Sequence, residues 1–287
     1  MEFLQPTSWP DALAAKAEYP DAVPIAGGTD IMVELNFDKR RPPALLDLMQ
    51  VPELGTWERD DGHIWLGAGV SYTRIIDELG AELPGLAMAS RTVGSPQIRN
   101  RGTVGGNLGS ASPAGDAHPP LLTVDAVVEV ESARSGVRRI PIGEFFTGVK
   151  RNALAPDELI SAIRIPVARG PEQFAKVGTR NAMVIAVCSF AIALDTERKT
   201  VGTGIGSAAP TPVRADAAQE LAAAELCWDD PASPLDPDLV IRFGDLVAAA
   251  ASPIDDVRGT AAYRHRALSV LARRTLGWAW ADYTRRS

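Results

Sequence analysis

Fifteen consecutive residues, Gly102–Asp116, carry almost no side-chain bulk and read GTVGGNLGSASPAGD. Glycine in place of larger residues costs conformational entropy on folding, so a long run of small residues calls for a reason. Main chain without Cβ atoms lets another group come close to its peptide N–H groups. The run therefore predicts close contact between this backbone and either another segment of the chain or a bound molecule.

A second glycine cluster, PIAGGTD at Pro24–Asp30, follows a short strand predicted over Ala22–Ala26. A helix is predicted to begin near Thr29, and both Thr29 and Asp30 suit its N-cap and first turn. The free N–H groups and the dipole of a helix N-terminus favour an anion. If the two clusters face each other, they could enclose a pyrophosphate and the flat ring system beyond it. The alternative is that they are tight turns and close strand packing.

Standard nucleotide motifs do not account for these glycines. A P-loop ends in Gly-Lys-Ser/Thr, and the sequence contains no such triplet. The Rossmann fingerprint needs three spaced glycines between a strand and a helix. GTGIG at 202–206 is followed by Pro210 and Pro212, which would stop a helix, and GAGVSY at 67–72 lacks the third glycine.

Composition narrows the class of protein. The chain has 287 residues, enough for one large or two ordinary domains, and its net charge of −7 argues against a general nucleic-acid binder. Two distant cysteines, Cys188 and Cys227, and three scattered histidines exclude a disulfide scaffold and predict that this chain holds no metal or iron–sulfur cluster. We see no signal peptide and no apolar run of about eighteen residues, so we expect a cytoplasmic protein without membrane insertion.

The order of predicted elements indicates two kinds of region. Strand, glycine turn and helix follow one another twice in the first 80 residues or so, a helix is predicted up to Gly94 and broken at Ser95-Pro96, and a helix and hairpin follow Asp116. After a strand ending at Pro166 and a linker at 167–173, three successive strands predict an antiparallel meander backed by helices from Asp216 onward. We place boundaries so that residues 1–58, 59–170 and 171–287 form three units.

Five stretches, in order, resemble a known family. AGGTD (26–30), IRNRGTVGGNLGSASPAGD (98–116), PDELISAIRIP (156–166), FAKVGTR (174–180) and GIGSAAPTPVRA (204–215) are similar to the FAD-binding, or medium, subunit of the molybdenum hydroxylases. This is the family of xanthine dehydrogenase and carbon monoxide dehydrogenase. The resemblance implies an α+β fold: an FAD-binding fold of the vanillyl-alcohol oxidase (PCMH) type in two α/β subdomains, then a C-terminal domain with a three-stranded antiparallel sheet and helices.

The resemblance also assigns residues to FAD. The two glycine clusters become the walls that hold the diphosphate, and further contacts lie downstream. The implied FAD-binding residues are Ala26, Gly27, Gly28, Thr29, Asp30, Ile31, Thr103, Gly105, Gly106, Asn107, Ser112, Asp116, Ile160 and Lys176.

We expect different roles for the charged residues in this set. A carboxylate beside a diphosphate is repulsive, so we expect Asp30 to cap its helix or to accept from a ribose or backbone donor. Asp116, with Ser112, matches the ribose or adenine side, and Lys176 matches a lysine beside the flavin ring, where a cation stabilises negative charge on the reduced ring. Without the resemblance, Lys176 on a strand would face solvent and Ile160 would be core. No side chain is predicted to be catalytic, because the flavin carries the chemistry.

The resemblance implies partners as well. Relatives work with a small subunit carrying two [2Fe–2S] clusters and a large molybdopterin subunit, and we expect a dimer of heterotrimers. Electrons pass from molybdenum through the clusters to FAD and then to NAD⁺, oxygen or another acceptor. Purines such as xanthine, aldehydes and N-heterocycles are the expected substrates of the complex. Two alternatives are a stand-alone flavin oxidase acting on a small alcohol and a structural partner that has lost its cofactor.

Overall fold

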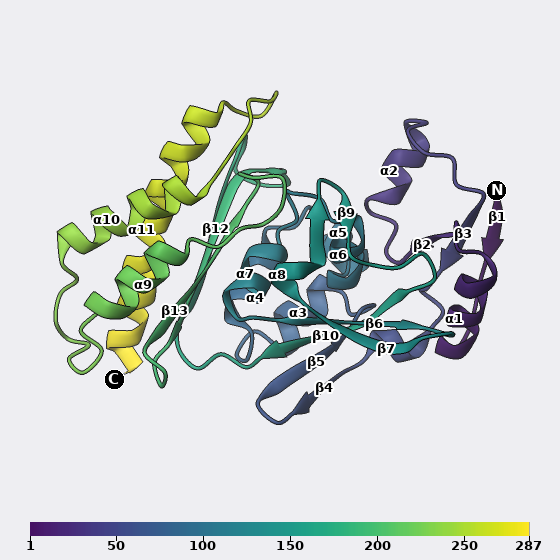
Figure 1. The fold of residues 1–287 in the computed structure, drawn as a ribbon, viewed down its shortest axis with the longest axis horizontal. Helices are drawn as coiled ribbons and strands as arrows, with labels where there is room; N and C mark the ends of the chain where they lie inside the picture. Colours follow the sequence, from purple (N-terminus) through teal and green to yellow (C-terminus); the bar gives the residue numbers. More distant parts are fainter. Residues whose placement is uncertain (287) are drawn as a thin grey trace.

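The N-terminal part of the chain is built on a small parallel sheet in the strand order β1-β3-β2. The computed structural model describes residues 1–286, and this sheet lies at the N-terminal end of the long axis, with α2 standing away from it (Figure 1). None of the side chains of α2 is buried. The elements are β1 (Glu2–Leu4), α1 (Trp9–Glu18), β2 (Val23–Ile25), α2 (Ile31–Asn36) and β3 (Ala44–Asp47).

The central part is a five-stranded antiparallel sheet in the order β4-β5-β10-β6-β7, with short helices packed over it. It shares one apolar core with the N-terminal sheet. Its strands are β4 (Trp57–Asp60), β5 (His63–Gly67), β6 (Val127–Ser132), β7 (Gly136–Pro141) and β10 (Leu159–Pro166), beside a small pair β8 (Phe146–Gly148) and β9 (Arg151–Asn152). Its helices are η1 (Pro52–Gly55), α3 (Tyr72–Glu78), α4 (Pro84–Arg91), α5 (Pro96–Arg101), α6 (Val104–Ser110), α7 (His118–Thr123) and α8 (Ile142–Phe145).

The C-terminal part is a three-stranded antiparallel meander, β11-β12-β13, with long helices along one face (Figure 1). Nine of the ten residues of β12 are buried, because helices of the C-terminal part cover one face and α4 and α7 lie against the other. The α+β class with this C-terminal sheet is therefore confirmed. The elements are β11 (Glu172–Gly178), β12 (Ala186–Asp195), β13 (Thr200–Gly206), α9 (Asp216–Glu225), α10 (Pro237–Ala250) and α11 (Ala261–Arg286).

Two local predictions differ from the structure. The small-residue run predicted as a loop contains α6, which Thr103 caps through its Oγ1, accepting from the Gly106 N–H at 2.9 Å. Burial of Val104 and Leu108 outweighs the low helix propensity of the glycines. The predicted break at Ser95-Pro96 is instead the start of α5, with Ser95 as N-cap and proline in the first turn.

Among residues 1–286, no helix is both long enough and apolar enough to cross a bilayer. Within the same described residues, no three His, Cys, Asp or Glu side chains gather in a way that could hold a metal ion.

Candidate functional site

The two glycine clusters touch each other. A Cβ built on Gly27 would lie 1.8 Å from the carbonyl oxygen of Arg101 and 2.9 Å from the nitrogen of Gly102. No side chain fits in that space, so the main chains of the two clusters are in direct contact. Gly28 has φ +73°, a left-handed conformation that favours glycine. The convergence expected from the sequence is therefore present.

Most glycines of the small-residue run make room for the chain itself. A Cβ on any of three of them would fall within about 2.2–3.3 Å of a neighbouring residue, which is too close for an ordinary contact. These are Gly102 against the ring of Tyr72, Gly105 against Ala68 and Gly115 against the ring of His118. Close packing within the chain is enough to explain the missing side chains at these three positions, and contact of the Gly105 main chain with FAD stays a prediction.

Gly106 and Gly109, in contrast, are not packed tightly against the rest of the chain. They lie one helical turn apart on α6, both are exposed, and we call them the bare face of α6. A Cβ on Gly106 would be 3.1 Å from the Thr103 Oγ1 and 3.9 Å from the Cβ of Ala26, and one on Gly109 would be 4.0 Å from Ile160. Glycine inside a helix costs about 0.5–1 kcal/mol relative to alanine. No close packing within the chain requires glycine at these two positions. Their missing side chains are therefore better explained by the close approach of a bound molecule.

The first cluster supplies donors next to this face. The main-chain N–H groups of Gly27, Gly28 and Thr29 have no hydrogen-bond acceptor within residues 1–286. Such donors fit the oxygens of a diphosphate. Asp30 is exposed at the N-cap position of α2 but makes no side-chain cap bond, so the capping alternative is wrong, and acceptance from a ribose or backbone donor stays a prediction. Ile31, the first residue of α2, is half-buried.

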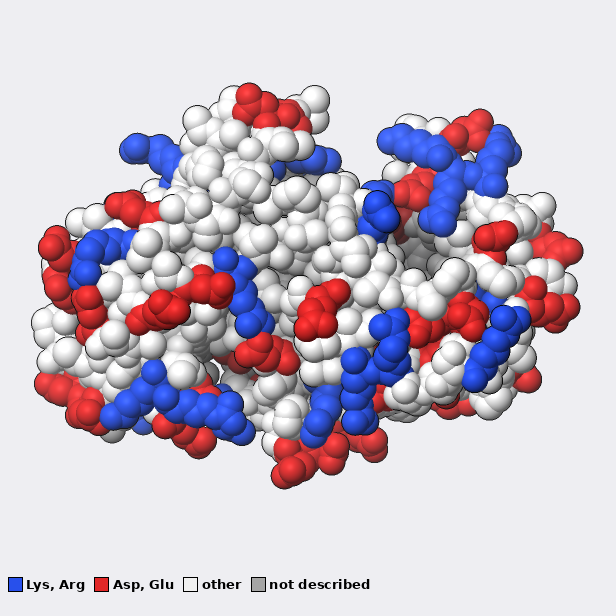
Figure 2. Space-filling view, in the orientation of Figure 1, with Lys and Arg blue, Asp and Glu red and all other residues white. Residues whose placement is uncertain are grey.

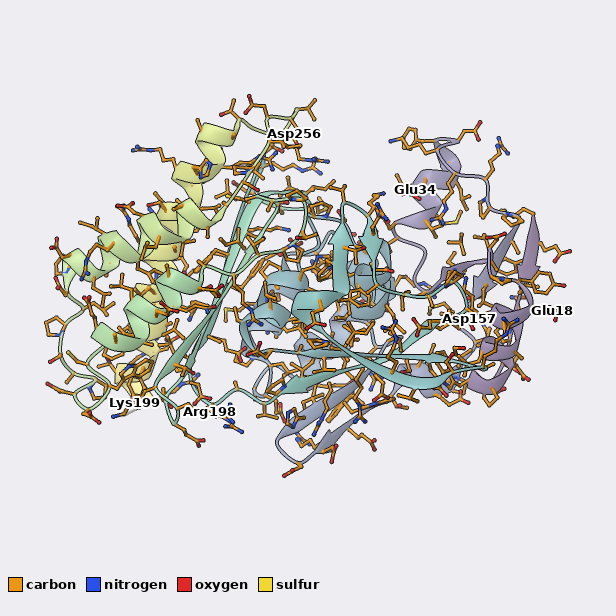
Figure 3. All side chains as sticks on the ribbon, viewed as in Figure 1. Glu18, Glu34, Asp157, Arg198, Lys199 and Asp256 are labelled. Carbon is orange, nitrogen blue, oxygen red and sulfur yellow. The ribbon has the colours of Figure 1, made fainter. Side chains whose placement is uncertain are left out.

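An ion pair connects the two sides of the site. Glu34, labelled in Figure 3, pairs from α2 with Lys150 of the turn between β8 and β9, and this pair lowers the pKa of Glu34. The Lys150 N–H also bonds to the carbonyl of Ala111, which ends α6, at 3.1 Å. Figure 2 shows charged side chains of both signs on the tip formed by α2 and the residues after it, standing apart from the neighbouring surface. Lys150 therefore ties this tip to the end of α6.

Asp116 and Lys176 form a buried ion pair between the central and C-terminal parts. The Lys176 Nζ lies 2.6 Å from the Asp116 Oδ2, and it also donates to the carbonyls of Thr92 (2.9 Å) and Val184 (3.2 Å). The Lys176 side chain is 8% exposed, so the solvent-facing alternative is wrong. Burial raises the pKa of Asp116, and the neighbouring ammonium opposes that rise.

Two buried polar atoms beside this pair have no partner within the described chain. They are the Asp116 Oδ1 and the Tyr72 hydroxyl, and burial together with the Asp116 charge raises the pKa of that hydroxyl. Buried polar groups in proteins are normally hydrogen-bonded to protein, water or ligand. A group that donates to Asp116, such as a hydroxyl or ring N–H of a cofactor, fits this position.

The remaining predicted residues hold the second wall in shape. The Asn107 side-chain oxygen accepts from the Ala117 N–H at 3.4 Å, and the Asn107 carbonyl contacts the His118 Nε2 at 3.2 Å. Burial lowers the pKa of His118 to about 4, so the ring is neutral at pH 7 and acts as a structural hydrogen-bonder. The Ser112 Oγ accepts from the Ala114 N–H at 3.3 Å.

The structure thus brings together the first cluster, α6 and Ile160 of β10, since Gly27 meets Arg101, a Cβ on Gly106 would face Ala26 and one on Gly109 would face Ile160. Asp116 and Lys176 lie beside α6, where the Ala117 N–H bonds to the Asn107 Oδ1. Sequence reasoning missed Gly109 and the pair formed by Glu34 and Lys150. The three-residue spacing of Gly106 and Gly109 would have indicated the former, if a helix had been predicted there. The site offers donors and a small-residue surface, which suits binding and orienting a cofactor.

The chain is similar to known proteins along its length. Residues 1–168 match the model for the FAD binding domain in molybdopterin dehydrogenase, and residues 173–279 match that for the CO dehydrogenase flavoprotein C-terminal domain. The chain is 35% identical to the nicotinate dehydrogenase FAD-subunit of Eubacterium barkeri, covering 70% of this chain and 71% of that protein. It is 33% identical to the xanthine dehydrogenase FAD-binding subunit of Escherichia coli, covering 74% and 75%.

The chain is also similar in fold to a solved structure. A chain of carbon monoxide dehydrogenase from Hydrogenophaga pseudoflava superimposes with a TM-score of 0.89 at 27% identity, covering 99% of this chain and 98% of that one. The PCMH-type fold implied by the sequence is therefore confirmed. From its two family matches and these relatives, the chain belongs to the FAD-binding subunits of the molybdenum hydroxylase family.

Proposed function

We propose that this chain is the FAD-binding electron-transfer subunit of a molybdenum hydroxylase that oxidises a purine or an N-heterocycle. The observation that carries the proposal is the bare face of α6, where Gly106 and Gly109 expose helix backbone beside the contact between Gly27 and Arg101. The names of two relatives, a nicotinate and a xanthine dehydrogenase, support the substrate class.

Each wall has a task in this proposal. The N–H groups of Gly27, Gly28 and Thr29 donate to the diphosphate, and the bare face of α6 allows the diphosphate to come close. The Asp116 Oδ1 accepts a hydrogen bond from the cofactor, and the Lys176 ammonium places positive charge at that end of the site. Ala26, Asp30, Ile31 and Ile160 line the site, and Thr103, Asn107 and Ser112 keep the second wall in shape. FAD, when bound, accepts electrons and passes them on.

Partner chains complete the proposed enzyme. A small subunit with [2Fe–2S] clusters and a large molybdopterin subunit supply the electrons and the hydroxylation site, in a dimer of heterotrimers located in the cytoplasm. The family matches, which end at residue 168 and begin again at residue 173, support the proposed boundary near residue 170. The stand-alone oxidase is disfavoured, since two of the relatives are named as subunits.

Copurification tests the proposal. We expect the native complex to carry flavin absorbance together with iron and molybdenum, and the isolated chain to take up added FAD in an equilibrium titration. A folded chain that takes up no FAD would refute the cofactor assignment. A yellow chain that copurifies with no iron- or molybdenum-containing partner would favour the stand-alone oxidase.

A further inference from the structure

One strand of the C-terminal part holds α4 of the central part at both ends. At the N-terminal end, the Glu172 Oε2 of β11 accepts from the Gly85 N–H at 2.8 Å. At the C-terminal end, the Lys176 Nζ donates to the carbonyl of Thr92, the C-cap residue of α4, at 2.9 Å. A side-chain oxygen thus accepts from a free N–H at the start of the helix, and a cation meets the negative end of the helix dipole.

The spacing along the two elements explains how both contacts form. Glu172, Phe174 and Lys176 alternate along β11 and so point to one face, and four residues of strand span about 13 Å. Gly85 and Thr92 are seven residues apart on α4, or about 10.5 Å of helix. Between the two polar contacts, Phe174 packs in a small apolar cluster that includes a residue of α4. One face of the strand therefore matches the length of the helix.

The Glu172 contact is closely fitted. Glu172 is 7% exposed, and a Cβ on Gly85 would lie 2.8 Å from its Oε2 and 3.2 Å from its Cβ. Within residues 1–286, the Glu172 carboxyl is the acceptor of the Gly85 N–H. Both groups are buried at this contact, so removing the acceptor leaves a buried donor unpaired.

We propose that Glu172 is a positioning residue, which fixes the place of β11 against α4 so that the Lys176 ammonium meets Asp116. Pairing with β12 sets the register of β11 within its own sheet, and the Glu172 contact with Gly85 fixes where that strand lies along α4. Glu172 acts on the cofactor only through Lys176 and Asp116. The inference rests on the proposed function where it concerns FAD, whereas the seating of β11 on α4 does not depend on FAD.

The test uses the whole chain, expressed with its partner subunits where these are needed, and four variants. Glu172→Leu removes the acceptor at similar size, and Glu172→Gln keeps an oxygen that accepts from Gly85. Gln173→Leu is the matched control, since Gln173 is the next residue of β11 and bonds to Asp282 of α11 instead of to α4. Lys176→Met serves as the reference for loss of the ammonium.

Hydrogen exchange of the FAD-free protein measures how firmly β11 is held against α4. We expect Glu172→Leu to speed exchange about tenfold at both ends of α4, at Gly85 and at 92–95, because both contacts open together. Glu172→Gln and Gln173→Leu should exchange as the wild type does. Faster exchange confined to the Gly85 end would overturn the inference, since Lys176 would then hold its place without Glu172.

Titration with FAD measures how strongly Glu172 affects cofactor binding. We expect Glu172→Leu to weaken FAD binding roughly tenfold, within the usual range for linked sites. In the Lys176→Met background the same change should have no further effect, because Glu172 acts through Lys176. Additive losses in the double variant would contradict this. If the wild type binds no FAD but the exchange pattern holds, the proposed function fails and the seating role stands.

Discussion

Replacing Gly106 by alanine tests whether the glycine is required by the packing of α6 or by the close approach of FAD. The added Cβ would lie 3.1 Å from the Thr103 Oγ1 and 3.9 Å from the Cβ of Ala26, so a shift of a few tenths of an ångström accommodates it. Alanine gains about 0.5–1 kcal/mol over glycine inside a helix, and the tight contact with Thr103 offsets part of this gain. We expect the FAD-free chain to melt at the wild-type temperature or up to about 2 °C higher.

The same methyl group occupies the surface on which we place the diphosphate. A displacement that lengthens two or three charge-assisted hydrogen bonds costs more than about 1.4 kcal/mol, which corresponds to at least a tenfold rise in the Kd for FAD. Fluorescence titration of the FAD-free protein measures the Kd, and calorimetry on the same sample measures the melting temperature. Unchanged or higher stability together with weaker binding is the signature of a position kept bare for a ligand.

Gly105 provides the matched control, one residue earlier on the same helix. Its added Cβ would meet the Cβ and the carbonyl oxygen of Ala68 at 2.5 Å, an overlap that costs about 1–3 kcal/mol in a packed core. Gly105→Ala should therefore melt several degrees lower without FAD. If Gly106→Ala binds FAD as tightly as the wild type, the bare face of α6 does not contact the diphosphate and the reasoning is refuted.

Gly27→Ala places a Cβ 1.8 Å from the Arg101 carbonyl oxygen, so the two clusters should separate and FAD uptake should be lost, as absorbance of the purified protein would show. Lys150→Ala breaks the pair with Glu34, and since half-exposed pairs contribute roughly 0.5–1 kcal/mol, stopped-flow release of FAD should be about two- to fivefold faster. Burial raises the pKa of Glu172 from 4.5 to about 7. Between these two pH values the folded state therefore holds a proton on Glu172 that the unfolded state has released. Stability should then fall as pH rises from about 5 to 8, and denaturation of Glu172→Gln at both pH values should lack this part of the slope.

The order of elements could be predicted from the sequence because it depends on local patterns. The meander of β11, β12 and β13 follows from three apolar runs separated by turn residues, and the strand ending at Pro166 is where it was predicted. The hairpin of β6 and β7 likewise turns at 133–136. These features need no knowledge of which segments meet in space.

What each glycine faces could not be predicted, because it depends on packing between distant segments. Gly102, Gly105 and Gly115 read like ligand-contacting glycines, yet they face Tyr72, Ala68 and His118. The helix α6 was also missed, since its glycines lower the local propensity while the burial of Val104 and Leu108 is a tertiary effect. For the same reason, nothing local to Glu172 indicates that its carboxyl meets a helix 87 residues earlier in the chain.

The hydrogen bonds of Lys176 decide how it can serve a flavin. An ammonium group has three donors, and here they go to Asp116, Thr92 and Val184. Unless one of these bonds is exchanged, Lys176 acts on the cofactor through its charge at a distance and not through a direct contact. The Asp116 Oδ1 remains free to accept, so the direct contact passes to Asp116, whose carboxylate Lys176 neutralises. Lys176→Met should therefore leave a buried, uncompensated carboxylate and weaken FAD binding more than Lys176→Arg, which keeps the charge, whereas equal losses would show that the shape of the side chain matters and its charge does not.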